Sequence, residues 1–104
     1  MTTQSVFNLA GYVFDWRHRT IAHDGEILFK LTAKEADLLF LFCEKPNEIV
    51  ERSFVLKKLW GYDDFFNARS MDVFITKLRK YLSGNESLSL ENIRGKGFRL
   101  NVKS

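Results

Sequence analysis

The segment from Arg69 to Leu82 constrains the fold of this chain more than any other part of the sequence. At the ~100° per residue of an α-helix, four of its apolar residues fall on one side and can seat the helix on a core. These residues are Met71, Ile75, Leu78 and Leu82. The opposite side carries Arg69, Val73, Thr76, Lys77 and Lys80. The segment therefore predicts an amphipathic helix with a basic outer face, which is either a solvated surface or a face that contacts phosphates and base edges.

The charge distribution along the chain favours a binding face. The formal net charge is +3. Residues 1–66 hold 8 Lys/Arg and 10 Asp/Glu, a net of −2, whereas residues 67–104 hold 8 Lys/Arg and 3 Asp/Glu, a net of +5. We therefore expect an anionic partner to dock on the C-terminal part. Net charge alone does not separate nucleic acid from a membrane surface or an acidic protein.

Length and composition predict one folded domain. With 104 residues and 45% hydrophobic content, the chain is expected to form a single core over residues 1–104, ordered over about residues 5–103. The longest apolar run, Leu38 to Cys43, is far shorter than the ~20 residues of a membrane span. One cysteine permits no internal disulfide, and Met1 to Ser5 lacks the features of a secretion signal. We therefore expect a cytoplasmic protein with no membrane partner.

The N-terminal part predicts a small antiparallel sheet of up to four strands. Short runs with strand-forming composition cover residues 6–9, 12–16, 20–23 and 26–30. Asp24-Gly25 between the last two runs is a strong signal for a two-residue hairpin, because both central positions of such a turn need φ > 0.

Two helices are predicted after this sheet. Thr32 with Glu35 three residues later forms a capping box that opens the first helix, and Pro46 ends it. Ser53 is the expected N-cap of a second, shorter helix that Gly61 stops.

The C-terminal part predicts the third helix followed by a hairpin. Residues 63–67 are expected to form a loop before the helix, and residues 83–85 end it. Strands over residues 90–94 and 98–102 are joined through Gly95-Lys96-Gly97 as an exposed tip. This order of elements predicts an α+β fold: a winged helix-turn-helix with an N-terminal four-stranded antiparallel sheet, three helices and a C-terminal β-hairpin wing.

Two cations at the hairpin extend the basic surface. Arg94 and Lys96 could be solubilising charges, but they follow a basic helix within one small domain, which favours contact with nucleic acid. A guanidinium at a hairpin tip suits the narrow, electronegative minor groove of A·T-rich DNA.

Several other residues have two interpretations. Asp72 is three residues after Arg69 and is expected to pair with it, the alternative being acceptance from a cytosine amino group. Trp60 is either a core anchor or a donor to a phosphate through its indole N–H. Phe74 and Tyr81 are expected to pack against the other helices, although the Tyr81 hydroxyl could also reach a phosphate.

Catalytic and cofactor-binding patterns are not found in the sequence. His18 and His23 have no companions at metal-ligand spacing, and no nucleotide-binding loop or nucleophile motif occurs. Cys43 lies on the apolar side of the first helix and is expected to be a buried thiol. We therefore expect neither an enzyme nor a bound cofactor or metal.

These segments together resemble the C-terminal DNA-binding domain of OmpR/PhoB-type response regulators, the winged-helix effectors of bacterial two-component systems. The resemblance covers most of the chain from residue 31 onward. Its matching segments are Leu31-Thr32 with Glu35, Leu38 and Leu39; Val50 with Arg52; Leu56 and Leu59-Trp60-Gly61-Tyr62; Arg69 to Val73, Ile75, Leu78-Arg79-Lys80 and Leu82; Ile93-Arg94-Gly95; and Gly97-Phe98-Arg99-Leu100.

The resemblance implies that the third helix enters the major groove of double-stranded DNA and that the hairpin reaches the minor groove. It implies base-reading positions at Val73 and Lys77, with Arg79 near the DNA. Backbone-contacting positions are implied at Trp60, Arg69 and Thr76, and the wing arginine is Arg94. It further implies head-to-tail dimers on direct-repeat half-sites, promoted when a sensor kinase phosphorylates an N-terminal receiver domain. No receiver domain is present, so the chain is expected to be a fragment of a longer regulator.

The chain also departs from the family pattern. Phe74 stands where the family often has His, which favours packing over a polar contact. Lys77 replaces the more usual Arg and weakens bidentate reading of guanine, and Phe98 replaces the usual Tyr. Two rival functions remain: a winged-helix module that docks to RNA polymerase without reading DNA, and the DNA-binding domain of a one-component, membrane-tethered regulator.

Overall fold

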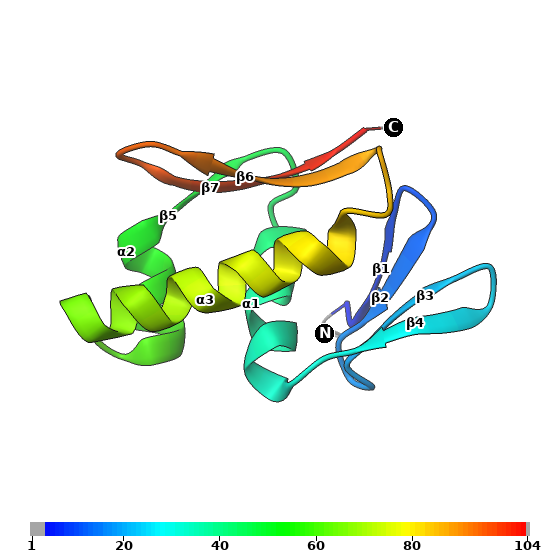
Figure 1. Cartoon of the computed structure of the whole chain (residues 1–104), viewed down its shortest axis with the longest axis horizontal. Coiled ribbons are helices and arrows are strands. Elements are labelled where there is room, and N and C mark those ends of the chain that lie inside the picture. The colour runs from blue at the N-terminus through cyan, green and yellow to red at the C-terminus, as the bar shows by residue number, and fades with distance from the viewer. Residues whose placement is uncertain (1–3, 104) are drawn as a thin grey trace.

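The N-terminal strands form the predicted four-stranded sheet. The computed structural model describes residues 4–103, so Met1 to Thr3 and Ser104 of the predicted 1–104 domain lie outside the described residues. The strands are β1 (Val6–Leu9), β2 (Tyr12–Asp15), β3 (Thr20–His23) and β4 (Glu26–Lys30), paired antiparallel in chain order (Figure 1). The Asp24-Gly25 hairpin is confirmed, with φ angles of 51° and 81°. Local turns therefore set the register of this sheet.

The first helix, α1 (Ala33–Cys43), begins at the predicted capping box. The Glu35 backbone N–H donates to Thr32 Oγ1 over 3.2 Å, and the Thr32 N–H donates to Glu35 Oε1 over 2.8 Å. Glu35 is only 2% exposed, and its carboxylate also accepts the Tyr81 hydroxyl at 3.2 Å. The capping carboxylate thus joins α1 to the third helix as well as satisfying the start of its own helix.

The second helix differs from its prediction. It consists of α2 (Arg52–Val55) and a π-helical turn, η1 (Leu56–Trp60). Ser53 is not the N-cap: Glu51 takes that place, without a side-chain hydrogen bond, because a strand leads directly into the helix. The stop at Gly61 is confirmed by its φ of 88°.

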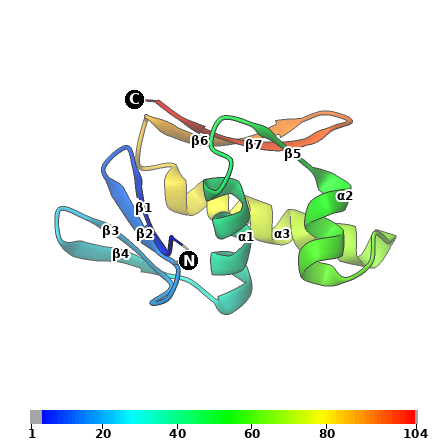
Figure 2. The ribbon, with the colours of Figure 1, turned by 180° about the vertical axis from the view of Figure 1, so that it is seen from behind.

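The third helix, α3 (Phe65–Leu82), starts earlier than predicted. Asp64 caps it by accepting the Asn67 backbone N–H at 2.8 Å, so residues 65–67 are helical rather than part of a loop. The predicted core face is confirmed, since Met71, Ile75, Leu78 and Leu82 are all at most 2% exposed. Figure 2 shows α1 and α2 on the side of α3 that faces the core.

The C-terminal hairpin belongs to a three-stranded sheet, which the sequence did not predict. Its strands are β6 (Leu88–Ile93) and β7 (Gly97–Val102), with β5 (Ile49–Glu51) paired to the other side of β7. The expected tip at residues 95–97 shifts to 94–96, because Gly97 pairs with both neighbouring strands. A Cβ at Gly97 would lie 2.1 Å from the Val50 carbonyl oxygen, so this glycine is required by close strand contact.

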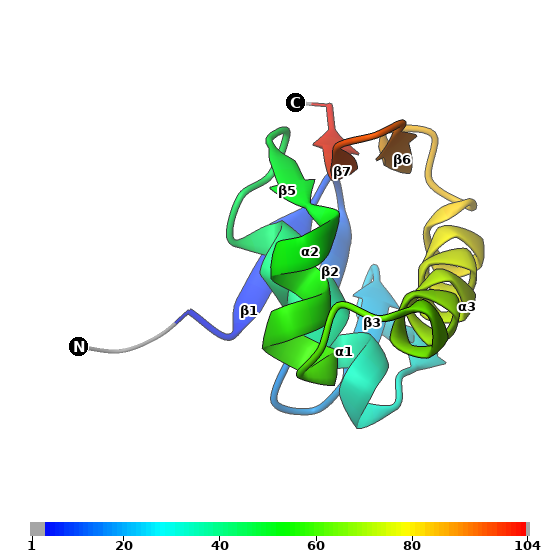
Figure 3. The ribbon, with the colours of Figure 1, turned by 90° about the vertical axis from the view of Figure 1, so that its left-hand side faces the viewer.

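One hydrophobic core joins both sheets and the helices. Figure 3, which looks along α3, shows the three-stranded sheet above the helices and α3 apart from α1 and α2 on the outer side. Cys43 is buried in this core as predicted, and burial, assisted by the charge of Glu44, raises the pKa of its thiol to about 12. Among residues 4–103, no helix combines the length and apolar character needed to cross a bilayer.

Candidate nucleic-acid interface

The outer face of α3 is open to solvent. Val73 is 56% exposed, and Arg69, Thr76, Lys77 and Lys80 are exposed as well. The Thr76 hydroxyl donates to the Asp72 carbonyl at 2.9 Å, which leaves its oxygen as an acceptor. Over the described part of the chain, none of the three cations on this face forms a salt bridge. Their charge is therefore available to an anion.

Asp72 does not pair with Arg69, and that prediction is wrong. Asp72 forms two 2.9 Å contacts with Arg52, one to each terminal guanidinium nitrogen. The guanidinium of Arg69 instead lies 5.8 Å from the ring centre of Phe65, one helical turn earlier. The early start of α3 supplies that ring, and β5 brings Arg52 opposite Asp72.

Arg52 is a residue whose role the sequence did not reveal. Its backbone N–H donates to the Lys96 carbonyl at the hairpin tip over 3.2 Å, and its guanidinium lies 5.7 Å from the ring centre of Phe98. Together with the Asp72 contact, these interactions connect the hairpin to the outer part of α3. In the sequence, Arg52 stood out only as one residue of the family pattern, and nothing there indicated its contact with Asp72.

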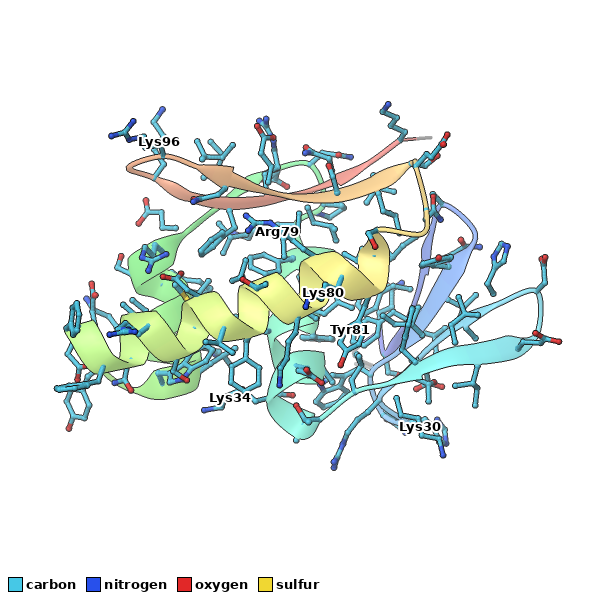
Figure 4. The ribbon with its side chains drawn as sticks, in the orientation of Figure 1. Lys30, Lys34, Arg79, Lys80, Tyr81 and Lys96 are labelled. Carbon is cyan, nitrogen blue, oxygen red and sulfur yellow. The ribbon has the colours of Figure 1, made fainter. Side chains whose placement is uncertain are left out.

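Arg79 makes a second connection between α3 and the hairpin. Its Nε–H donates to the Leu90 carbonyl of β6 over 2.8 Å, and Figure 4 shows its side chain between the helix and the hairpin. One of its N–H groups is therefore committed to the fold, while the residue as a whole stays exposed. Arg79 positions the hairpin and also adds positive charge beside it.

The hairpin tip carries the two predicted cations. Arg94 and Lys96 flank Gly95, whose φ of 76° is the left-handed conformation that a tight turn requires. Both side chains are exposed, and Lys96 is seen at the end of the hairpin in Figure 4. The tip and the outer face of α3 form two basic surfaces, and Arg79 adds a cation where α3 meets β6.

Trp60 is half-buried and its indole N–H has a partner. The N–H donates to Ser70 Oγ at 3.1 Å, and the ring meets that of Phe74 edge-on at 5.7 Å. Lys34 places its ammonium 4.7 Å from the centre of the Trp60 ring. The packing predicted for Phe74 is therefore confirmed, and Trp60 lies between a ring and a cation.

Tyr81 packs its ring against a strand rather than against another helix as predicted, and only its hydroxyl reaches α1. Its ring lies 5.0 Å from that of Phe29 on β4, and its hydroxyl donates to the buried Glu35. Burial, and next the charge and hydrogen bond of Glu35, raise the pKa of Tyr81. The hydroxyl is thus engaged by Glu35 within the protein.

The two histidines lie away from this surface. His18 contacts the Asp15 carboxylate at 2.9 Å, and His23 contacts the Gly11 carbonyl at 3.2 Å. No cluster of His, Cys, Asp and Glu suited to a metal ion occurs among residues 4–103.

Fold and surface together define a winged-helix domain with a basic outer face on α3, and comparison with known proteins agrees on the fold. The family described as "Transcriptional regulatory protein, C terminal" matches residues 25–100. The transcriptional regulatory protein RprY of Bacteroides fragilis is 47% identical over 96 residues, which are 92% of this chain and 40% of that protein.

Two solved structures share the fold. The DNA-binding domain of Klebsiella pneumoniae RstA, solved in complex with its RstA box, has a TM-score of 0.75 and 26% identity, covering 94% of this chain and 98% of that one. The DNA-binding domain of CpxR from E. coli has a TM-score of 0.80 and 20% identity, covering 97% of this chain and all of that one.

The chain belongs to the family of C-terminal DNA-binding domains of OmpR/PhoB-type response regulators. It spans 32–40% of the length of the first curated relatives that it matches.

Proposed function

We propose that this chain binds specific sequences of double-stranded DNA, with α3 in the major groove and the hairpin tip in the minor groove. The observation that carries the proposal is the exposed face of α3 beside a basic hairpin. On this face three cations surround Val73, and within residues 4–103 none of them has a carboxylate partner. The RstA domain, solved with its DNA box, has the same fold. The surface offers charge for phosphates together with groups that can meet base edges.

The side chains divide into two kinds of contact. Val73 and Lys77 are assigned to base reading, Val73 through contact with a thymine methyl and Lys77 through acceptors on guanine. The phosphate contacts are assigned to Arg69, Thr76, Arg79, Lys80 and Lys96, and the minor-groove contact to Arg94. Binding is expected to weaken steeply as salt rises, because phosphate contacts release counterions.

The rest of the regulator is inferred from the family. RprY is about two and a half times as long as the matched region, which leaves room for a receiver domain that a sensor kinase phosphorylates. We infer that two copies bind head to tail on direct-repeat half-sites once the receiver is phosphorylated. These inferences concern the longer protein and rest on the resemblance.

A second surface favours contact with the transcription machinery. Tyr62, Phe65 and Phe66 at the start of α3 are 68–81% exposed, which is unusual for three neighbouring aromatic residues. We propose that this patch contacts RNA polymerase. One copy of the domain could then bind DNA through α3 and contact the polymerase through the patch.

Selection from a random duplex library tests the DNA-binding proposal. We expect the parent to select a defined motif. Lys77→Ala should lose preference at particular base pairs, with a loss of about 1–3 kcal/mol in discrimination free energy for each lost contact. Arg94→Ala is expected to weaken binding mainly for A·T-rich flanks. Lys45→Ala, beyond the far end of α1, is the matched control for loss of one charge. Failure to enrich a motif, with all variants binding like the parent, would overturn the proposal.

A further inference from the structure

Lys34 holds a fixed cation beside the recognition helix. It lies in the first turn of α1, and its ammonium donates to the Leu59 carbonyl over 3.1 Å while lying 4.7 Å from the centre of the Trp60 ring. A flexible surface lysine would adopt many rotamers, whereas two contacts restrict this one. The ammonium is thus held at the end of η1, where the chain turns toward α3.

The charge of this cation is not neutralised within the fold. No carboxylate among residues 4–103 forms a salt bridge with Lys34, and the side chain is only half-buried. An ammonium has three N–H donors, and the Leu59 carbonyl uses one. At least one donor therefore remains for an outside acceptor.

Trp60 has no N–H donor left for an outside acceptor in this structure. Its single donor is directed to Ser70 Oγ, and its ring supports Lys34 on one side and meets Phe74 on another. A direct indole–phosphate bond would require the contact with Ser70 to break. The ring acts instead as a platform for the cation.

The position of Lys34 suits a phosphate on the opposite side of the groove from the hairpin. In Figure 4, α3 runs between Lys96 at the hairpin tip and Lys34 at the start of α1. A duplex that receives α3 in its major groove, about 12 Å wide, presents a phosphate strand on each side of the helix.

We propose that Lys34 binds a DNA backbone phosphate on the side of α3 away from the hairpin, with Trp60 as the platform that holds its ammonium. The proposal rests on the proposed function and adds a contact to it. It also assigns to Lys34 the phosphate contact that the family resemblance implies for Trp60.

The salt dependence of binding tests this assignment, measured with the selected duplex and the whole chain. Lys34→Met keeps the apolar stem and removes the charge. We expect it to reduce the slope of log K against log salt by about 0.9, and to weaken binding on the order of threefold to tenfold on every duplex alike. Lys34→Arg should restore the parental slope. Trp60→Phe keeps a ring under the cation but removes the N–H, and its slope should equal that of the parent.

The controls separate this proposal from its alternatives. Lys45→Met removes a charge beyond the other end of α1, about 15 Å along the helix axis, and should leave the slope unchanged. Thermal unfolding of each variant shows whether an effect is structural, since a purely structural Lys34 would change the melting temperature and not the slope. A parental slope for Lys34→Met, or a reduced slope for Trp60→Phe alone, would overturn the assignment. Absence of specific binding by the parent would instead overturn the proposed function.

Discussion

The two sheets of this domain are built in different ways. The N-terminal sheet joins four consecutive strands through short turns, so every pairing is local. The C-terminal sheet places β7 between β6, its hairpin partner, and β5, which precedes α2. The first sheet forms from strands that are neighbours in sequence. In the second sheet, β5 and β6 are separated in sequence by α2, η1 and α3, the helices of the helix-turn-helix. The surface proposed to meet DNA therefore depends on distant contacts, and the supporting scaffold on local ones.

The sheets also attach to α3 through different side chains. The N-terminal sheet contacts the end of α3 through the Phe29 and Tyr81 rings, and the Asn85 amide just after α3 donates to the Ala10 carbonyl over 3.0 Å. The C-terminal sheet is held by two arginines, Arg52 and Arg79, in addition to its buried apolar face. Guanidinium contacts therefore add to apolar packing in positioning the hairpin relative to α3.

The largest expected effect comes from a methyl group between β5 and β7. In Gly97→Ala the new Cβ would lie 2.1 Å from the Val50 carbonyl oxygen, so the two strands must separate. We expect a loss of roughly 3 kcal/mol in the free energy of unfolding, measured by urea denaturation. In Gly25→Ala in the N-terminal sheet the new Cβ has open space around it, so the only strain is the left-handed φ of residue 25. We expect a loss of about 1 kcal/mol in the free energy of unfolding. Equal losses for both variants would contradict the contrast between the sheets.

A smaller effect is expected from the Arg52–Asp72 pair. The side chains are 37% and 54% exposed, so solvent screens the pair and a double-mutant cycle to alanine should give a coupling of about 0.5–1 kcal/mol. The cycle for Arg69 and Asp72 serves as the control and should give a coupling near zero. A larger coupling for Arg69 would restore the pairing predicted from sequence. Arg52→Ala should also weaken DNA binding, since the hairpin loses one of its connections to α3.

The smallest effect is a pH dependence at the N-terminal attachment. Because the pKa of Tyr81 is raised in the folded state, the unfolded state loses this proton first as pH rises above 10. The contribution to stability is therefore complete below pH 10 and declines as pH rises through the folded pKa. In Tyr81→Phe the free energy of unfolding should fall less steeply as pH rises. Urea denaturation at several pH values between about 8 and 11 measures this. Tyr62→Phe, at an exposed site, should keep the parental profile.

Features set by short-range chemistry were predictable from sequence. The Asp24-Gly25 hairpin, the Thr32–Glu35 capping box and the buried side of α3 each follow from the geometry of a turn or helix. The outer face of α3 was predictable for the same reason, because 3.6-residue periodicity fixes which side chains oppose the core.

Features set by distant contacts were not predictable. The three residues of β5 are too few to show a strand period, and their partner β7 lies beyond α3. Without β5, nothing in the sequence placed Arg52 against Asp72. The hydrogen bonds from Arg79 to the Leu90 carbonyl and from Trp60 to Ser70 likewise depend on how the elements pack. A sequence therefore does not show which N–H donors remain free to bind DNA.

The central position of β7 has a consequence for the order in which the molecule assembles. This strand follows every other described element along the chain, yet it lies in the middle of its sheet. During synthesis on a ribosome, the N-terminal sheet and the helices can emerge and begin to pack before β7 exists. Strand β5 then has no strand partner until β7 has been made. The hairpin and α3 therefore acquire their final relative position only when nearly the whole described chain has been made.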